Sequence, residues 1–158
     1  MSKDRLVPDY LRALQDGTEL VIRNPSAFRP WQHVLDPICG YILLAQKLAS
    51  NDGSSYFGGW NFGPTSNPVT VLEIVQMLSE ICADKRFKLD NEIRPAEAQS
   101  LVLDSSKSQI KLGWKPRLDL REALELTFNW YTADINNHDM MSHSLDEIEV
   151  YLRHVEIH

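Results

Sequence analysis

The sequence predicts a mixed α/β protein, an α+β-like arrangement in which helices and strands alternate along one chain. Apolar residues recur at helical spacing in several segments, and short runs rich in β-branched and aromatic residues lie between them. A length of 158 residues is enough for one domain with a hydrophobic core, and the sequence contains no internal repeat. We therefore expect one main α/β unit.

The composition argues against two classes of partner. The chain has 43% hydrophobic residues and a formal net charge of −6, which is unfavourable for binding nucleic acid. A small phosphorylated ligand is still compatible, because it needs only one or two local cations. No run approaches the length of a membrane span, and no apolar signal region follows Met1–Arg5. We therefore expect a cytoplasmic protein with no membrane partner.

The first part of the chain is expected to form two helices separated by a short strand. Leu6 to Gly17 has apolar residues on one side and ends at a glycine, as helices commonly do. Glu19 to Arg23 fits a short strand. A second helix is expected from Pro37 to about Ala49, with Asp36 as its N-cap. It is apolar nearly all round, so we expect it to be well buried.

Three further strands are expected in the second part of the chain. Tyr56 to Pro64 is a run of aromatic residues punctuated by glycine, and the two shorter strands are Arg86 to Leu89 and Ser100 to Leu103. Capping patterns place the later helices. The expected caps are Thr70 with Glu73, Asp104 before a short helix ending at Gly113, Asp119 with Glu122, and Ser144 with Glu147.

Two arginines that precede prolines are the candidate anion-binding residues. Arg29 offers a planar fork of donors suited to phosphate oxygens, and Pro30 favours an extended backbone at Arg29. Arg94 also precedes a proline, in a polar loop. If both converge, they could bind one diphosphate. The alternative is a surface arginine whose aliphatic stem covers Trp31.

The sequence lacks the common catalytic and metal-binding patterns. It has no Gly-x-Gly-x-x-Gly, no phosphate-binding loop ending in Lys-Ser or Lys-Thr, and no Gly-x-Ser-x-Gly. His33 has no nucleophile beside it and is interpreted as a structural histidine. Cys39 and Cys82 lie in apolar helical patterns and are expected to be buried free thiols. We therefore predict no catalytic residue and no metal site.

Five short motifs occur in an order that resembles a known family. They are Asp4–Asp9, Val21–Pro25, Arg29–Val34, Trp60–Pro64 and Leu112–Pro116. The resemblance is to the C-terminal half of nucleotide-sugar 4,6-dehydratases of the extended short-chain dehydrogenase/reductase superfamily, and it runs from about Asp4 to Tyr131. The wording Arg-Pro-Trp-Gln-His-Val is most similar to the CDP-glucose 4,6-dehydratases.

The resemblance also implies what this sequence lacks. Family members carry an N-terminal Rossmann half with a glycine-rich NAD loop, a Tyr-x-x-x-Lys pair and acid/base carboxylates, and none of these is present. The complete enzymes oxidise the sugar at C4 with bound NAD, eliminate water across C5 and C6, and return the hydride. We therefore expect NAD in the complete family enzyme, no cofactor bound by this chain alone, and no catalysis by this chain alone.

The resemblance assigns six candidate substrate-binding residues. Arg5 and Leu6 would lie near the ribose and diphosphate, Ile22 and Arg23 near the base, and Arg29 and Arg94 on the diphosphate. Arg94 is the less secure of the last two, because it precedes Pro-Ala-Glu where many relatives have Pro-Gly-Asp.

Residues 1–136 are accordingly expected to form a nucleotide-sugar-binding domain, and residues 137–158 a polar linker and an amphipathic helix. The Trp60 to Phe62 strand would lack its usual neighbour and leave an apolar edge. The edge needs an N-terminal Rossmann half, self-association, or the Ser144 to Val155 helix folded over it. The leading interpretation is the CDP-glucose-binding portion of a 4,6-dehydratase. The alternatives are a non-catalytic nucleotide-sugar-binding or interaction module, or a portion of a dTDP-sugar dehydratase or UDP-sugar epimerase.

Overall fold

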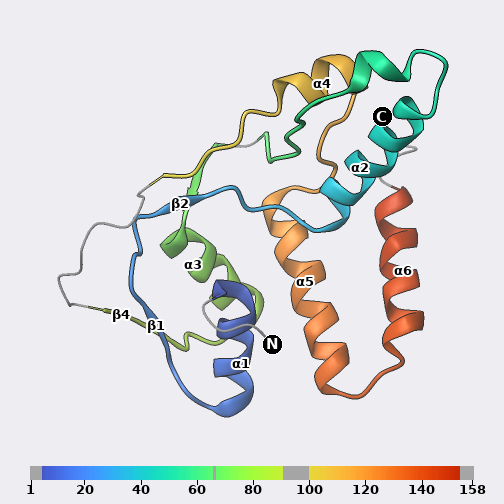
Figure 1. Ribbon diagram of the computed structural model, residues 1–158. Helices are drawn as coiled ribbons and strands as arrows, with labels where there is room; N and C mark the ends of the chain where they lie inside the picture. The colour runs from blue at the N-terminus through green and yellow to red at the C-terminus, as the bar shows by residue number, and fades with distance from the viewer. Residues whose placement is uncertain (1–4, 66, 91–99, 154–158) are drawn as a thin grey trace.

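The computed structural model describes residues 5–65, 67–90 and 100–153, and it confirms a mixed fold of helices and small sheets (Figure 1). The strands are only two or three residues long. The elements in chain order are α1 (Leu6–Asp16), β1 (Leu20–Ile22), β2 (Phe28–Arg29), α2 (Leu35–Leu48), the 3₁₀ helix η1 (Gly53–Tyr56), β3 (Val69–Thr70), α3 (Val71–Ile81), β4 (Phe87–Leu89), α4 (Ser106–Leu112), α5 (Leu120–Ile135) and α6 (Met140–Arg153).

Two small sheets connect segments that are far apart in the sequence. β1 pairs in parallel with β4, with Leu20 opposite Phe87. β2 pairs antiparallel with β3, with Arg29 opposite Val69. The second pairing fixes the backbone of Arg29, since a strand residue bound on the ladder has little freedom in φ and ψ.

The main hydrophobic core lies where α1, α3 and α5 meet β1 (Figure 1). Its helices present apolar residues at helical spacing to one another, as amphipathic helices do when they pack. The buried members are Tyr10, Leu11, Ile22, Ile74, Val75, Leu78 and Leu124.

The burial of Tyr10 should make the protein less stable as the pH rises into the alkaline range. Its side chain is fully buried, its hydroxyl donates to the carbonyl of Asp84 at 2.6 Å, and burial raises the pKa of the phenol to about 12. The unfolded phenol ionises near pH 10, so the free energy of unfolding should fall as the pH rises from 10 to 12. We expect this fall to be smaller in Tyr10→Phe, measured by urea unfolding at several pH values. Equal losses in the two proteins would contradict this role.

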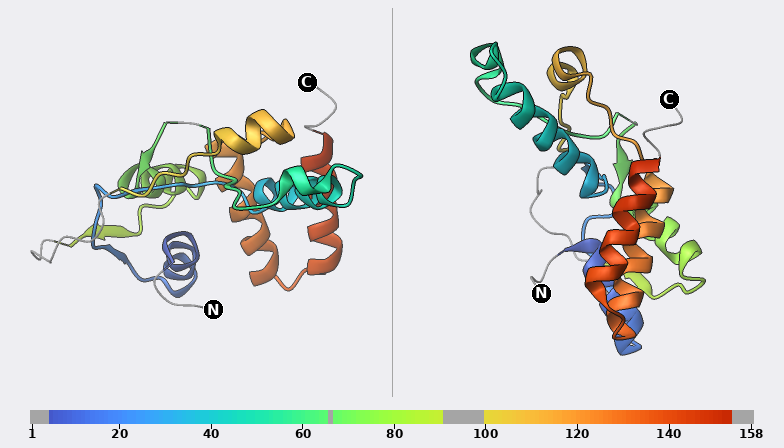
Figure 2. Two further views of the ribbon diagram at one scale, coloured as in Figure 1. Left: turned by 45° about the horizontal axis from the view of Figure 1, so that its top comes forward. Right: turned by 90° about the vertical axis from the view of Figure 1, so that its right-hand side faces the viewer.

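A second, smaller cluster lies between α2, α4 and residues 57–63, at the end of the molecule that Figure 2 shows projecting beyond α5. Phe62 is its centre, with its ring edge-on to Trp114 at a centroid distance of 5.1 Å and to Tyr41 at 5.2 Å. A side chain at Gly40 would collide with the Phe62 ring, so this glycine is needed for close packing of α2 on residue 62.

Several local predictions are confirmed. α1 ends at Gly17, whose φ is 67°. Both predicted capping boxes on α3 and α5 form, Thr70 with Glu73 and Asp119 with Glu122. The Asp104 carboxylate accepts from the amide of Ser106 at the start of α4, although the N-cap residue is Ser105 and not Asp104 as predicted. Cys39 and Cys82 are free thiols, although each is only half-buried.

The prediction that Asp36 caps α2 is wrong. α2 begins at Leu35, so Asp36 lies inside its first turn. The Asp36 side chain is 1% exposed and turns inward, where its Oδ1 accepts from the backbone amide of Arg117 at 2.8 Å and from the hydroxyl of Tyr151 at 2.9 Å. The Asp36 carboxylate therefore makes tertiary hydrogen bonds and does not cap its own helix.

The prediction that α2 is well buried is also wrong. Ile38, Tyr41 and Ile42 are 42%, 59% and 57% exposed. Among the described residues, the cluster around Phe62 covers the side of the helix that carries Leu43 and Leu44 and reaches only the edge of the Tyr41 ring. An apolar pattern all round a helix indicates that the whole helix surface can be buried against other apolar groups. The described residues bury one face of α2 only.

Two of the predicted strands are not formed as expected. Residues 57–65 contain no strand, and Tyr56 lies in η1. Of Ser100 to Leu103, only Ser100 makes a bridge, to Phe28. A strand needs a neighbour for its hydrogen bonds, and the part of the chain that the structure describes offers these segments none over most of their length.

The tail helix differs from its prediction in start and position. α6 begins at Met140, and Ser144 and Glu147 lie inside it rather than at its cap. The Ser144 hydroxyl instead accepts from the indole of Trp130 at 3.0 Å. α6 packs along α5, as Figures 1 and 2 show, and its polar contacts reach the start of α2 rather than Trp60 to Phe62.

Candidate functional site

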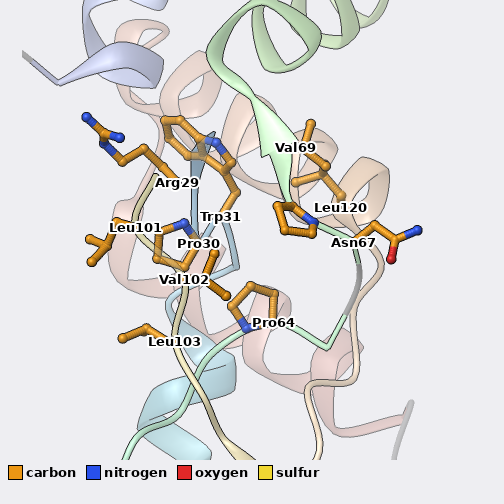
Figure 3. Close-up of a pocket in the computed structure, with 11 residues that line it drawn as sticks. Arg29, Pro30, Trp31, Pro64, Asn67, Val69, Leu101, Val102, Leu103 and Leu120 are labelled. Atoms are coloured by element: carbon orange, nitrogen blue, oxygen red, sulfur yellow. The ribbon is translucent and has the colours of Figure 1, made fainter. Parts of the chain in front are cut away.

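Arg29 lies at the rim of a small apolar pocket, which we call the Arg29 pocket. Its volume is about 30 Å³, and Figure 3 shows the guanidinium directed away from the ring of Trp31 and from Pro64. The Arg29 Nη1 donates to the carbonyl of Phe28 at 2.8 Å, which holds the side chain back over its own strand. The lining residues are Arg29, Pro30, Trp31, Pro64, Asn67, Pro68, Val69, Leu101, Val102, Leu103 and Leu120.

Trp31 also lines a larger pocket between α5, α6 and the start of α1, which we call the α5–α6 pocket. Its volume is about 640 Å³, within the usual range for small-molecule sites. Arg5 lines it as well, so Arg5 and Arg29 lie on two pockets that share Trp31. The lining residues are Arg5, Val7, Trp31, Gln32, His33, Val34, Leu35, Leu120, Ala123, Leu124, Thr127, Trp130, Tyr131, Ser144, Glu147 and Ile148.

The segment between the two pockets is held by its neighbours. The amide of Trp31 donates to the carbonyl of Arg29 at 3.0 Å. The Gln32 Nε2 donates to the carbonyl of Phe62 at 2.7 Å, which joins this segment to the second cluster. His33 is 6% exposed, and its Nε2 lies 3.3 Å from the Glu147 Oε1. This burial and pairing agree with a structural histidine.

The structure places the other predicted site residues differently. Arg5 precedes α1, and its amide donates to Asp9 Oδ2 at 2.9 Å. Leu6 packs against the main core, and Ile22 is buried within it at 2% exposure. Arg23 is exposed just after β1, and neither Ile22 nor Arg23 lines either pocket. Arg94 lies outside the described residues.

Tyr151 and Glu147 are site-region residues that the sequence reasoning missed. Both belong to α6, where their spacing of four shows only that they share a helix face. Burial and the hydrogen bond to Asp36 hold the pKa of Tyr151 well above its usual value, so the hydroxyl stays a donor. No sequence signal indicated that this face contacts His33 and Asp36.

The described ranges contain no group of three or more His, Cys, Asp or Glu residues able to hold a metal. Within the same ranges, no helix combines the length and apolar character needed to cross a membrane. A dinucleotide does not fit this chain either, because no glycine-rich turn joins a strand to a helix among these elements.

Comparison with known proteins gives consistent relatives. No protein-family model matches the chain. It is 42% identical over 153 residues to a CDP-glucose 4,6-dehydratase of Salmonella typhimurium, covering 96% of this chain and 42% of that protein. It is 26% identical over 133 residues to a dTDP-glucose 4,6-dehydratase of Actinoplanes, covering 83% of this chain and 39% of that protein.

Two solved structures share the fold. A UDP-glucose 4-epimerase from Stenotrophomonas maltophila with bound NAD gives a TM-score of 0.72 at 22% identity, covering 84% of this chain and 41% of that one. A dTDP-glucose 4,6-dehydratase from Bacillus anthracis in complex with NAD gives 0.67 at 17% identity, covering 85% and 41%. This chain therefore spans about two fifths of the length of the relatives it matches.

The 42% identity covers nearly the whole chain, and the shared fold corresponds to one end of the solved relatives. The chain belongs to the extended short-chain dehydrogenase/reductase family of sugar-nucleotide dehydratases and epimerases, and its sequence and fold match the C-terminal part of these proteins.

Proposed function

We propose that this chain is the nucleotide-sugar-binding part of a CDP-glucose 4,6-dehydratase. The observation that carries the proposal is the pair of arginines on pockets that share Trp31, in a chain with a net charge of −6. Guanidinium groups bind phosphate oxygens with two parallel hydrogen bonds, and a diphosphate offers enough oxygens for both. The 42% identity to the Salmonella enzyme supports CDP-glucose as the ligand.

The proposed roles follow the family resemblance. Arg5 and Arg29 bind the diphosphate with Arg94, Leu6 lies against the ribose, and the chain at Ile22 and Arg23 reaches the base. Because the Ile22 side chain is in the core, its contribution comes from the backbone. NAD, bound by another part of the complete enzyme, supplies hydride transfer, and the residues of this chain bind and orient the sugar nucleotide.

Calorimetric titration of the purified chain with CDP, UDP and dTDP tests this function. We expect CDP to bind most tightly, because the sugar nucleotide of the Salmonella relative carries cytosine. Equal binding of the three would contradict the base preference and favour the dTDP-sugar or UDP-sugar alternatives. The absence of any binding would favour a non-catalytic interaction module.

We also propose that the exposed face of α2 is where the remaining part of the family protein docks. This docking face consists of Val34, Ile38, Tyr41 and Ile42, which recur at helical spacing and are between 42% and 61% exposed. More than half of the length of the Salmonella relative lies outside the match, so a large part of the family protein has no counterpart here. Exposed apolar residues that share one side of a helix are typical of an interface.

The backbone of the segment that follows η1 supports a partner that contains a β-sheet. No amide from Gly58 to Phe62 donates a hydrogen bond to another described residue. The carbonyls of Gly59 and Asn61 accept from Lys107 and Ser108 of α4, so one edge of the segment is already used. The carbonyl of Phe62 also accepts from the Gln32 side chain, so the backbone amides of the segment are what a neighbouring strand could bind. An NAD-binding α/β domain would supply both a strand and apolar cover for α2.

A further inference from the structure

α6 is attached to the segment that follows Arg29 by two buried polar contacts. The Nε2 of His33 lies 3.3 Å from the Oε1 of Glu147, and their side chains are 5% and 12% exposed. The hydroxyl of Tyr151 donates to the Oδ1 of Asp36 at 2.9 Å, and Tyr151 is 3% exposed. The Tyr151 bond to a buried carboxylate is of a kind that is among the stronger hydrogen bonds in proteins, whereas the His33–Glu147 contact is a close approach without hydrogen-bond geometry.

The Asp36 contact belongs to a wider set of tertiary bonds. Asp36 Oδ1 also accepts from the amide of Arg117, and the indole of Trp114 donates to the carbonyl of Asp36 at 3.1 Å. The Arg117 guanidinium lies over the Tyr151 ring, 5.1 Å from its centroid. Removing the tyrosine hydroxyl would therefore leave a buried carboxylate with one partner fewer on its side chain.

The contacts are close to Arg29 along the chain. Only three residues separate Arg29 from His33, and Pro30 limits the backbone between them. Gln32 is bonded to the carbonyl of Phe62 on the other side. With β2 held by β3 and His33 held by α6, the short segment between them has few ways to move.

α6 is also shared with the Salmonella relative. The match covers 96% of this chain, so it leaves unmatched fewer residues than the 14 of α6. The helix is therefore part of the region that the two proteins have in common.

We propose that α6 acts as a clamp on the Arg29 segment, with Glu147 and Tyr151 as positioning residues for the guanidinium that binds phosphate. This inference rests on the proposed nucleotide-sugar binding. Tyr151 lines neither pocket, and Glu147, which lines the α5–α6 pocket, is turned toward His33. Each acts by holding His33 or Asp36, and these in turn fix the direction from which Arg29 reaches an anion.

A double-mutant cycle with CDP as the probe tests the clamp. Tyr151→Phe keeps the ring over Arg117 and removes only the hydroxyl, and Glu147→Gln keeps the shape of the second anchor. We expect each to weaken CDP binding by about 3- to 20-fold in the wild-type background. In the Arg29→Ala background the same changes should cost less than about twofold, because the group they position is gone. Arg153→Ala, which removes an exposed ion pair to Glu149 on the same helix, is the matched control and should leave binding unchanged.

The outcomes separate this role from general support of the fold. Equal losses of CDP affinity in the two backgrounds, or no loss in either, would overturn the clamp while leaving the nucleotide-binding function intact. Absence of CDP binding by the wild-type chain would overturn the proposed function and this role with it. If Tyr151→Phe fails to fold, Glu147→Gln decides the question: because Glu147 lines the pocket of Arg5, an effect that persists in the Arg29→Ala background would indicate direct action on the ligand and overturn the clamp.

Discussion

Replacing Arg29 with alanine should weaken CDP binding by about tenfold to a hundredfold, which corresponds to roughly 1.5 to 3 kcal/mol for a lost charge-assisted contact. The effect should be large because the pairing of β2 with β3 fixes the backbone at position 29. The segment therefore cannot shift to bring another side chain to the phosphate. Titration calorimetry of the variant and the wild type with CDP measures it.

Two further variants show whether the loss is specific. Arg29→Lys keeps the charge without the planar fork, so its affinity should lie between those of wild type and Arg29→Ala. Arg121→Ala removes an arginine that pairs with Glu80 and Glu125 on an exposed face, and it should bind CDP as the wild type does. A loss in Arg121→Ala as large as that in Arg29→Ala would indicate a general electrostatic effect and refute a diphosphate contact at Arg29.

The parts of the fold that sequence predicted well are those decided within a few residues. Gly17 ends α1 because a left-handed residue closes the last turn, and the Thr70 and Asp119 boxes form because each joins groups three residues apart. Such signals do not depend on what the rest of the chain does.

The errors occurred where distant residues compete for the same group. Asp36 has the sequence of an N-cap, but its carboxylate binds groups at positions 117 and 151. Ser144 and Glu147 fit a capping box, but Trp130 and His33 contact their side chains inside the helix. Periodicity cannot reveal these partners, because it describes one element at a time.

In the candidate site, too, local features could be predicted from the sequence and features that depend on tertiary packing could not. Arg29 could be singled out from its own neighbours, because a proline and a tryptophan follow it. That Arg5 lies on a pocket sharing Trp31 depends on how α1 and α5 pack, which no local pattern contains. Packing, which no local pattern contains, also directs the Ile22 side chain into the core and leaves its backbone for the base contact that the resemblance implies.

Placing two charges on the docking face of α2 should abolish association with the rest of the family protein. The double variant Ile38→Glu, Ile42→Glu puts carboxylates where an apolar interface would have to desolvate them, and we expect at least about a 100-fold loss of affinity. The measurement is co-purification of this chain with a co-expressed part of the Salmonella dehydratase that precedes the matched region. The wild-type chain should be retained.

The fold itself should tolerate these two changes, since Ile38 and Ile42 are 42% and 57% exposed and the buried side of α2 is untouched. Leu145→Glu is the control, because it places one such carboxylate on a leucine of α6 that is 54% exposed. It should leave co-purification unchanged. If the double variant is retained as well as the wild type, α2 is not the interface. If Leu145→Glu also abolishes retention, the association does not depend specifically on α2. Exposed apolar residues on two separate helices would then contribute alike, as in nonspecific apolar association.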